Sequence, residues 1–196
     1  MNRARFVAQA GIIAAVYGGF TIAVLLMPGY LGWGPVQFRV SEALTVIALF
    51  TPAAIPGLAL GTAIANATLA AQIGPAGLLD VVFGSLATLL GAAWTWRFRK
   101  RLYVALAGPV VANAIIVPAY LPVLFRALGI DELPFLGIDP ASGLFLVYGA
   151  GVVTVGAGQA AVVYGLGLPL AVLLRRHAAL LMHDERTEPG ARQHER

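Results

Sequence analysis

The chain has 196 residues, of which 59% are hydrophobic and 11% are charged, and its mean hydropathy is +0.83. Ordinary soluble domains carry roughly 25% charged residues, so this composition excludes a soluble globular protein and indicates a polytopic membrane protein. Cysteine is absent from the sequence, which excludes disulfides, thiolate metal sites and cysteine nucleophiles. The formal net charge of +4 comes from basic residues at the ends of apolar runs, so it indicates membrane topology and not nucleic-acid binding.

Six apolar segments account for most of the chain, and about 17 to 25 helical residues suffice to cross a hydrocarbon core of about 30 Å. We expect spans at residues 6–27, 40–50, 54–72, 79–96, 102–124 and 143–174. The first apolar run is longer than the roughly 7 to 15 residues of a signal peptide, so we expect it to be retained as a span. The prediction is an all-α, six-helix transmembrane bundle over residues 1–176.

The second segment is too short to cross the membrane alone, and Pro52 and Pro56 follow it. Because proline removes a backbone donor and ends or kinks a helix, the second and third segments are expected to form a broken pair. Short or proline-interrupted spans often mark the binding site of a transporter.

The basic residues predict the orientation of the bundle. With a cytoplasmic N-terminus, the outer loops hold only Arg39 and Arg126. The inner side then holds Arg3, Arg5, Arg97, Arg99, Lys100, Arg101, Arg175 and Arg176. This imbalance predicts that both termini are cytoplasmic. We expect residues 126–142 to form an outer loop or lid, and residues 177–196 to form a polar cytoplasmic tail that is disordered in part.

Charged side chains at the edges of the spans are the first candidates for chemistry. Glu42 begins the second span and Asp80 the fourth, both at outer ends, and an ionisable group in a span normally faces a partner or water. Arg39 and Glu42 are three residues apart, so they either pair with each other or contact a ligand. Gln37 and Ser41 add neutral polar groups that an ion pair would not require. Asp80 either joins the same site or caps the fourth helix.

Further polar side chains lie deeper in the spans, and they are candidates for the same cavity. They are Thr62, Asn66, Asn113, Tyr120, Tyr148 and Gln159. Each also has a structural alternative, because polar side chains in membrane helices commonly form interhelical hydrogen bonds worth about 0.6 kcal/mol.

The sequence contains no zinc, phosphate-loop or catalytic-triad pattern, and its three histidines, His177, His183 and His194, all lie in the tail. We therefore expect no metal, no cofactor and no enzymatic activity. An intramembrane enzyme that uses Glu42 and Asp80 as an acid–base pair stays an alternative, as does a structural membrane protein whose polar groups only hold helices together.

Small residues recur at intervals of three or four positions along the first span. They are Ala4, Ala8, Ala10, Gly11, Ala14, Ala15 and Gly18. This spacing lets another helix approach closely, either within the bundle or on a separate membrane subunit.

Three segments closely resemble the queuosine-precursor transporter family: GPVQFRVSEALT at 34–45, TPAAIPG at 51–57 and DVVFGSLAT at 80–88. The resemblance runs from about residue 3 to 175 and includes GLGLP at 165–169. Members of this family are substrate-binding S components of energy-coupling-factor (ECF) transporters. The resemblance implies a six-helix subunit that captures a 7-deazaguanine precursor of queuosine from outside, in its nitrile or aminomethyl form. It also implies a transmembrane coupling protein and two cytosolic ATPases as partners.

Residue roles follow from the same resemblance. The small-residue face of the first helix would dock on the coupling protein. A carboxylate of Glu42 or Asp80 would accept hydrogen bonds from the base, and Arg39, Asn66 or Asn113 would donate to its carbonyl group. The family often has Glu after the glycine of the sixth span, whereas Gln159 stands there in this chain, which favours the uncharged nitrile precursor. An S component for another vitamin or small heterocycle stays an alternative.

Overall fold

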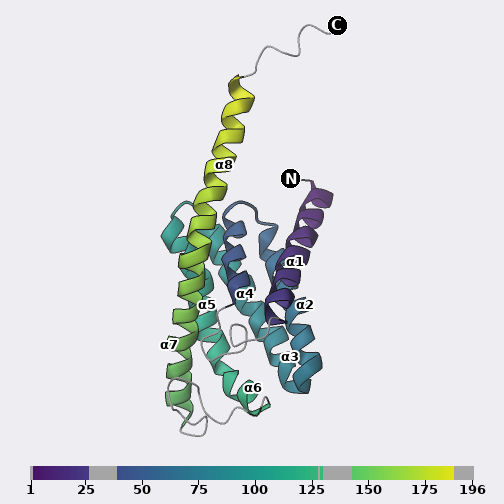
Figure 1. The fold of residues 1–196 in the computed structure, drawn as a ribbon, viewed down its shortest axis with the longest axis vertical. Coiled ribbons are helices and arrows are strands. Elements are labelled where there is room, and N and C mark those ends of the chain that lie inside the picture. Colours follow the sequence, from purple (N-terminus) through teal and green to yellow (C-terminus); the bar gives the residue numbers. More distant parts are fainter. Residues whose placement is uncertain (1, 27–38, 128, 130–142, 188–196) are drawn as a thin grey trace.

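The computed structural model describes residues 2–26, 39–127, 129 and 143–187, and every regular element in these ranges is a helix (Figure 1). Gln37, most of the expected outer loop and residues 188–196 of the expected tail lie outside the described residues. The elements are α1 (Arg3–Leu25), η1 (Val40–Leu49), α2 (Ala54–Ile73), η2 (Gly74–Ala76), α3 (Gly77–Leu79), η3 (Asp80–Gly84), α4 (Ser85–Arg97), α5 (Leu102–Ile116), η4 (Val117–Ala119), α6 (Leu121–Ala127), α7 (Leu144–Val162), η5 (Val163–Gly167) and α8 (Leu168–Thr187).

Five helical stretches of the described chain are long and apolar enough to cross a membrane. They are Arg3–Leu25, Ala54–Gln72, Gly74–Arg97, Leu102–Ala119 and Phe145–His177, and Val40–Leu49 is a shorter apolar helix. The prediction of an all-α, multi-pass membrane protein is therefore confirmed. The described residues contain five full-length candidate spans and one short helix, which lies in the segment that was expected to be too short to cross the membrane alone.

The start of α1 and the end of α8 point to the same end of the bundle (Figure 1). Helices α7, η5 and α8 follow one another without a break, and α8 continues past Arg176 to Thr187. The segment that was expected to be a polar tail therefore begins as a helical extension of the last span.

The fourth span begins earlier than expected, at Gly74 and not near residue 79. Pro75 lies in its first turn, where backbone N–H groups have no acceptor within the helix, so proline costs no hydrogen bond there. Asp80 therefore lies inside the span, at the start of a π-helical turn, and its side chain caps no helix end. The capping alternative for Asp80 is wrong for this reason.

Helix η1 lies in the middle of the bundle and contacts α1, α2, α4, α5, α7, η5 and α8. Most of its residues are buried, and Val46 and Leu49 pack in one cluster with Leu106 and Val163. A 3-10 helix rarely exceeds three or four residues because its hydrogen-bond geometry is poor. Ten residues in this conformation indicate that contacts from the surrounding helices, and not local propensity, stabilise it.

Helix α5 contains Pro109, which cannot donate a hydrogen bond to the carbonyl of Ala105 one turn earlier. The hydroxyl of Thr95 on α4 donates to that carbonyl at 3.0 Å. A Cβ at Gly91 would lie 2.8 Å from the Cα of Pro109, so α4 and α5 approach closely at this level. A neighbouring helix thus satisfies the group that the proline leaves without a donor.

Helices α1 and α2 pack closely through glycines. A Cβ at Gly61 of α2 would lie 2.7 Å from the carbonyl oxygen of Ala14 and 3.1 Å from the amide nitrogen of Gly18. A Cβ at Gly57 would lie 2.8 Å from the carbonyl oxygen of Ala10. Three of the small residues of α1 therefore serve packing inside the bundle.

We expect Gly61→Ala to destabilise the protein by about 1 to 3 kcal/mol, because the added methyl group forces α1 and α2 apart. The matched control is Gly11→Ala, where the Cβ would meet nothing within 4 Å. Both changes bring the same gain in helix propensity, so the difference between their free energies of unfolding reports the packing of α1 against α2. The free energy of unfolding in detergent measures the effect, and equal values for both variants would contradict the close α1–α2 contact.

Candidate functional site

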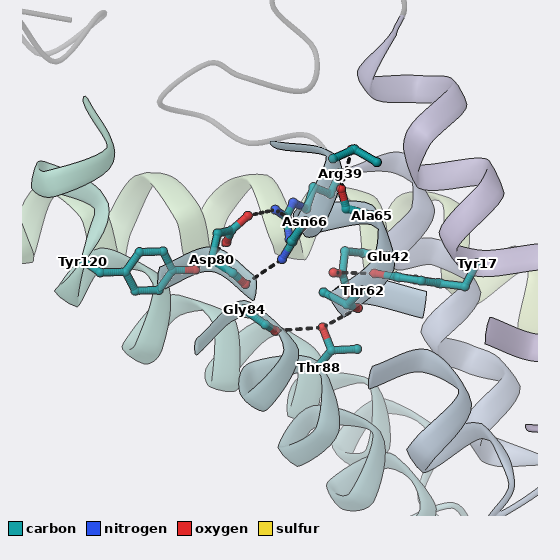
Figure 2. Close-up of polar contacts among 11 residues, drawn as sticks. Tyr17, Arg39, Glu42, Thr62, Ala65, Asn66, Asp80, Gly84, Thr88 and Tyr120 are labelled. Carbon is teal, nitrogen blue, oxygen red and sulfur yellow. Dashed lines mark hydrogen bonds and ion pairs between the residues drawn. The ribbon is translucent and has the colours of Figure 1, made fainter. Parts of the chain in front are cut away.

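A buried ion pair lies at the centre of the polar network in Figure 2. Nη2 of Arg39 lies 2.7 Å from Oδ2 of Asp80, and the two side chains are 10% and 4% exposed. The same nitrogen donates to Oδ1 of Asn66 at 3.1 Å. Arg39 comes from the residue before η1, Asn66 from α2 and Asp80 from η3, so this contact joins three segments.

The side chain and the backbone carbonyl of Asp80 both accept hydrogen bonds. Tyr120 donates its hydroxyl to Oδ1 of Asp80 at 2.6 Å, and Nδ2 of Asn66 donates to the Asp80 backbone carbonyl at 2.7 Å. A Cβ at Gly84 would lie 2.8 Å from both Oδ1 of Asp80 and Nδ2 of Asn66, so the network needs glycine there. Both carboxylate oxygens of Asp80 thus have protein partners, and one of these partners is the Arg39 guanidinium.

Glu42 is completely buried and is not the partner of Arg39. Its Oε1 accepts a hydrogen bond of 2.8 Å from the hydroxyl of Tyr17 on α1. The alternative of a local Arg39–Glu42 ion pair is therefore wrong, because Asp80 takes the guanidinium group from across the bundle.

Four buried polar atoms have no hydrogen-bond partner in the described part of the chain. They are Nε of Arg39, Oε2 of Glu42, Oγ of Ser85 and Nε2 of Gln159. The Gln159 side chain is 3% exposed and neighbours the Glu42 carboxylate. A buried polar group without a partner costs about 1 to 3 kcal/mol, so such groups are rare without a functional reason.

Two threonines lie beside this network (Figure 2). Oγ of Thr62 lies 2.9 Å from the Leu58 carbonyl oxygen and 3.1 Å from Oγ of Thr88, and its single hydrogen serves one of these contacts at a time. Thr88 donates to the Gly84 carbonyl at 3.1 Å. These hydroxyls bond to one another and to the backbone. They connect α2 with η3 and α4 next to the charged groups.

The structure brings together most of the predicted site residues: Arg39, Glu42, Thr62, Asn66, Asp80, Tyr120 and Gln159. Ser41 is buried at the start of η1, and Gln37 lies outside the described residues. Two others have separate contacts: Asn113 donates to the Pro109 carbonyl at 2.9 Å within α5, and Tyr148 donates to the Ile115 carbonyl at 3.0 Å.

Two residues of the network, Tyr17 and Gly84, were not predicted from the sequence. Tyr17 lies in an apolar span, where a single tyrosine indicates packing. The available signal was its position on one helical face with Ala14, Gly18 and Thr21, all of which are buried. Gly84 had no signal, because its role depends on the tertiary approach of Asn66 and Asp80.

We expect Asp80→Asn to lower the free energy of unfolding by about 3 to 5 kcal/mol, because it leaves the Arg39 charge buried without compensation. The double variant Arg39→Gln/Asp80→Asn removes both charges and should recover most of that loss. Unfolding of the purified protein in detergent measures both. A double variant that loses the sum of the two single effects would contradict a coupled ion pair.

The family comparison agrees with these observations. A family model described as "QueT transporter" matches residues 7–176. Neither the curated proteins nor the solved structures include a match to the chain. The matched region contains all of the grouped site residues. It also covers the five full-length candidate spans, except for the first four residues of Arg3–Leu25 and the last residue of Phe145–His177. The chain therefore belongs to the QueT transporter family and is a multi-pass membrane protein of a transport system.

Proposed function

We propose that this protein is the S component of an ECF transporter and binds a 7-deazaguanine precursor of queuosine. The family supports a membrane transporter with a small-molecule substrate. The resemblance of the three sequence segments supports the ECF class, with the protein in the cell membrane and both termini in the cytoplasm. The observation that supports a deazaguanine as the substrate is the group of buried polar atoms without partners around Glu42 and Arg39.

The chemistry of a deazaguanine complements these atoms. Its pyrimidinone ring presents an N–H donor next to a carbonyl acceptor. Oε2 of Glu42 would accept from that N–H, while Nε of Arg39 or Nε2 of Gln159 would donate to the carbonyl. Hydrogen bonds to charged groups contribute about 1.5 to 3 kcal/mol each, so two of them would orient the base.

The surrounding contacts prepare these groups before the ligand binds. Asp80 and Asn66 fix the Arg39 guanidinium through Nη2, which leaves its Nε as the donor without a partner. Tyr17 fixes Glu42 through Oε1 and leaves Oε2. Groups that are already ordered lose little conformational entropy on binding, and this increases affinity.

Glu42→Gln should weaken binding of the nitrile precursor about tenfold to a hundredfold, because the amide replaces a charged acceptor that pairs with the base. Titration calorimetry with the purified protein measures this change. Tyr148→Phe serves as the control and should leave affinity unchanged, because its hydroxyl contacts only the Ile115 carbonyl. Unchanged affinity in a folded Glu42→Gln variant would move the site elsewhere.

Gln159 bears on the choice between the two precursors. A neutral amide beside Glu42 can donate to a nitrile nitrogen and adds no negative charge for an ammonium group. We therefore expect the wild-type protein to bind the nitrile more tightly than the aminomethyl form, and Gln159→Glu to reverse that order. Titration calorimetry with both compounds measures these affinities. Equal affinities of the wild-type protein for the two compounds would contradict the predicted preference for the nitrile.

Only some of the small residues of α1 that were predicted to dock are accessible to a partner. Ala14 and Gly18 are buried against α2, whereas Ala4, Ala8, Gly11 and Ala15 are exposed. The exposed members recur every three or four residues and so share one face of the helix. We assign contact with the coupling protein to this exposed face, where a partner helix can approach closely.

Leucine at Ala8 or Ala15 should abolish uptake in cells that carry the complete transporter, because the larger side chain separates the partner helix. Substrate affinity of the isolated protein should not change. Val16→Leu is the control, since Val16 is exposed but lies about 100° around the helix from Ala15, off this face. Normal uptake by both alanine variants would contradict docking at this face, and Ala14→Leu should instead impair folding because Ala14 packs against Gly61.

A further inference from the structure

The turn between α4 and α5 lines an open surface cavity that lies away from the buried polar network. Its volume is about 470 Å³, and its lining residues are Arg97, Phe98, Arg99, Lys100 and Arg101. Four of these five side chains are cationic. The cavity is therefore suited to an anion and not to an apolar ligand.

Helix α8 adds a further cation to this turn. Nη2 of Arg175 donates to the Arg99 carbonyl at 3.0 Å. The Arg99 guanidinium lies over the Trp96 ring at 3.9 Å from its centroid and donates to the Trp96 carbonyl at 3.0 Å. These contacts hold two guanidinium groups in fixed positions, which distinguishes this turn from a set of freely solvated charges.

The two carboxylates whose side chains the structure describes, Glu42 and Asp80, lie in the buried polar network and pair with none of these cations. Like charges that are gathered in one turn repel one another, particularly beside a medium of low dielectric constant. A bound anion would remove this repulsion.

A shallow, largely apolar groove lies on the surface of α8. Its volume is about 420 Å³, and its lining residues are Leu168, Pro169, Val172, Leu173 and Arg176. Phe98 of the turn and Leu168 of the groove pack against the same core cluster, so the two features lie close together. The groove runs along the helix toward Arg176, the residue next to Arg175.

We propose that this cationic cavity and apolar groove bind one anionic phospholipid. The phosphate would lie among the guanidinium and ammonium groups of the turn, and an acyl chain would follow the groove along α8. Basic pockets between membrane helices are known to bind anionic headgroups. The groove favours a lipid over free phosphate or an acidic protein segment, because neither of those would use an apolar channel that ends at a cation.

Native mass spectrometry of the full chain, released from nanodiscs that contain phosphatidylglycerol or phosphatidylcholine, tests this site. We expect one retained phosphatidylglycerol and no retained phosphatidylcholine. The variant Lys100→Gln/Arg101→Gln should weaken phosphatidylglycerol binding about 30-fold, which corresponds to two lost basic contacts. Both side chains are exposed, so the folded state should persist, and the unfolding midpoint checks this.

Two further variants test the cavity and the groove separately. Arg3→Gln/Arg5→Gln removes the same charge from the exposed start of α1 and should leave lipid binding unchanged. Leu173→Ser should weaken binding without changing the charge. Equal losses in both double variants would show general surface attraction and overturn the proposal. Displacement of the lipid by inorganic phosphate would show that the cavity binds free anions. If the Lys100→Gln/Arg101→Gln variant lost transporter assembly but kept its lipid, the turn would be a protein-docking site. Either result would also overturn it.

Discussion

The ion pair between Arg39 and Asp80 is the contact on which the polar centre of this protein depends. It joins the start of η1 to a π-helical turn inside the fourth span, and Asn66 and Tyr120 attach α2 and the segment after η4 to the same carboxylate residue. A charge in a membrane span is tolerated when it faces a partner or water. Here each charge makes the burial of the other possible, so the site and the packing of four segments are one arrangement.

A second arrangement positions Glu42. Glycines at 57 and 61 let α2 lie against the backbone of α1, and Tyr17 on the buried face of α1 then reaches the Glu42 carboxylate. The small residues of α1 itself lie on two faces. One face, with Ala14 and Gly18, packs against α2, and the other, with Ala8 and Ala15, is exposed.

Much of the fold could be predicted from the sequence, because apolar runs of membrane-spanning length leave little choice of structure. The third span was expected at residues 54–72 and is found as Ala54–Gln72. The start of the fourth span was missed, because Gly74-Pro75 suggested a turn whereas proline is accepted in the first turn of a helix. Similarly, local spacing suggested an ion pair of Arg39 with Glu42, but the actual partner is 41 residues away along the chain. Such pairs depend on tertiary packing, which spacing does not reveal.

The 3-10 conformation of helix η1 increases the distance between Glu42 and the end of that helix. A 3-10 helix rises about 2.0 Å per residue, against 1.5 Å for an α-helix, so its ten residues extend about 20 Å and not 15 Å. Measured along this helix from its end at Leu49, Glu42 lies about 14 Å away, roughly half the thickness of a 30 Å hydrocarbon core. The 3-10 conformation thus carries the Glu42 carboxylate about 14 Å from Leu49, whereas an α-helix of the same residues would carry it only about 10 Å.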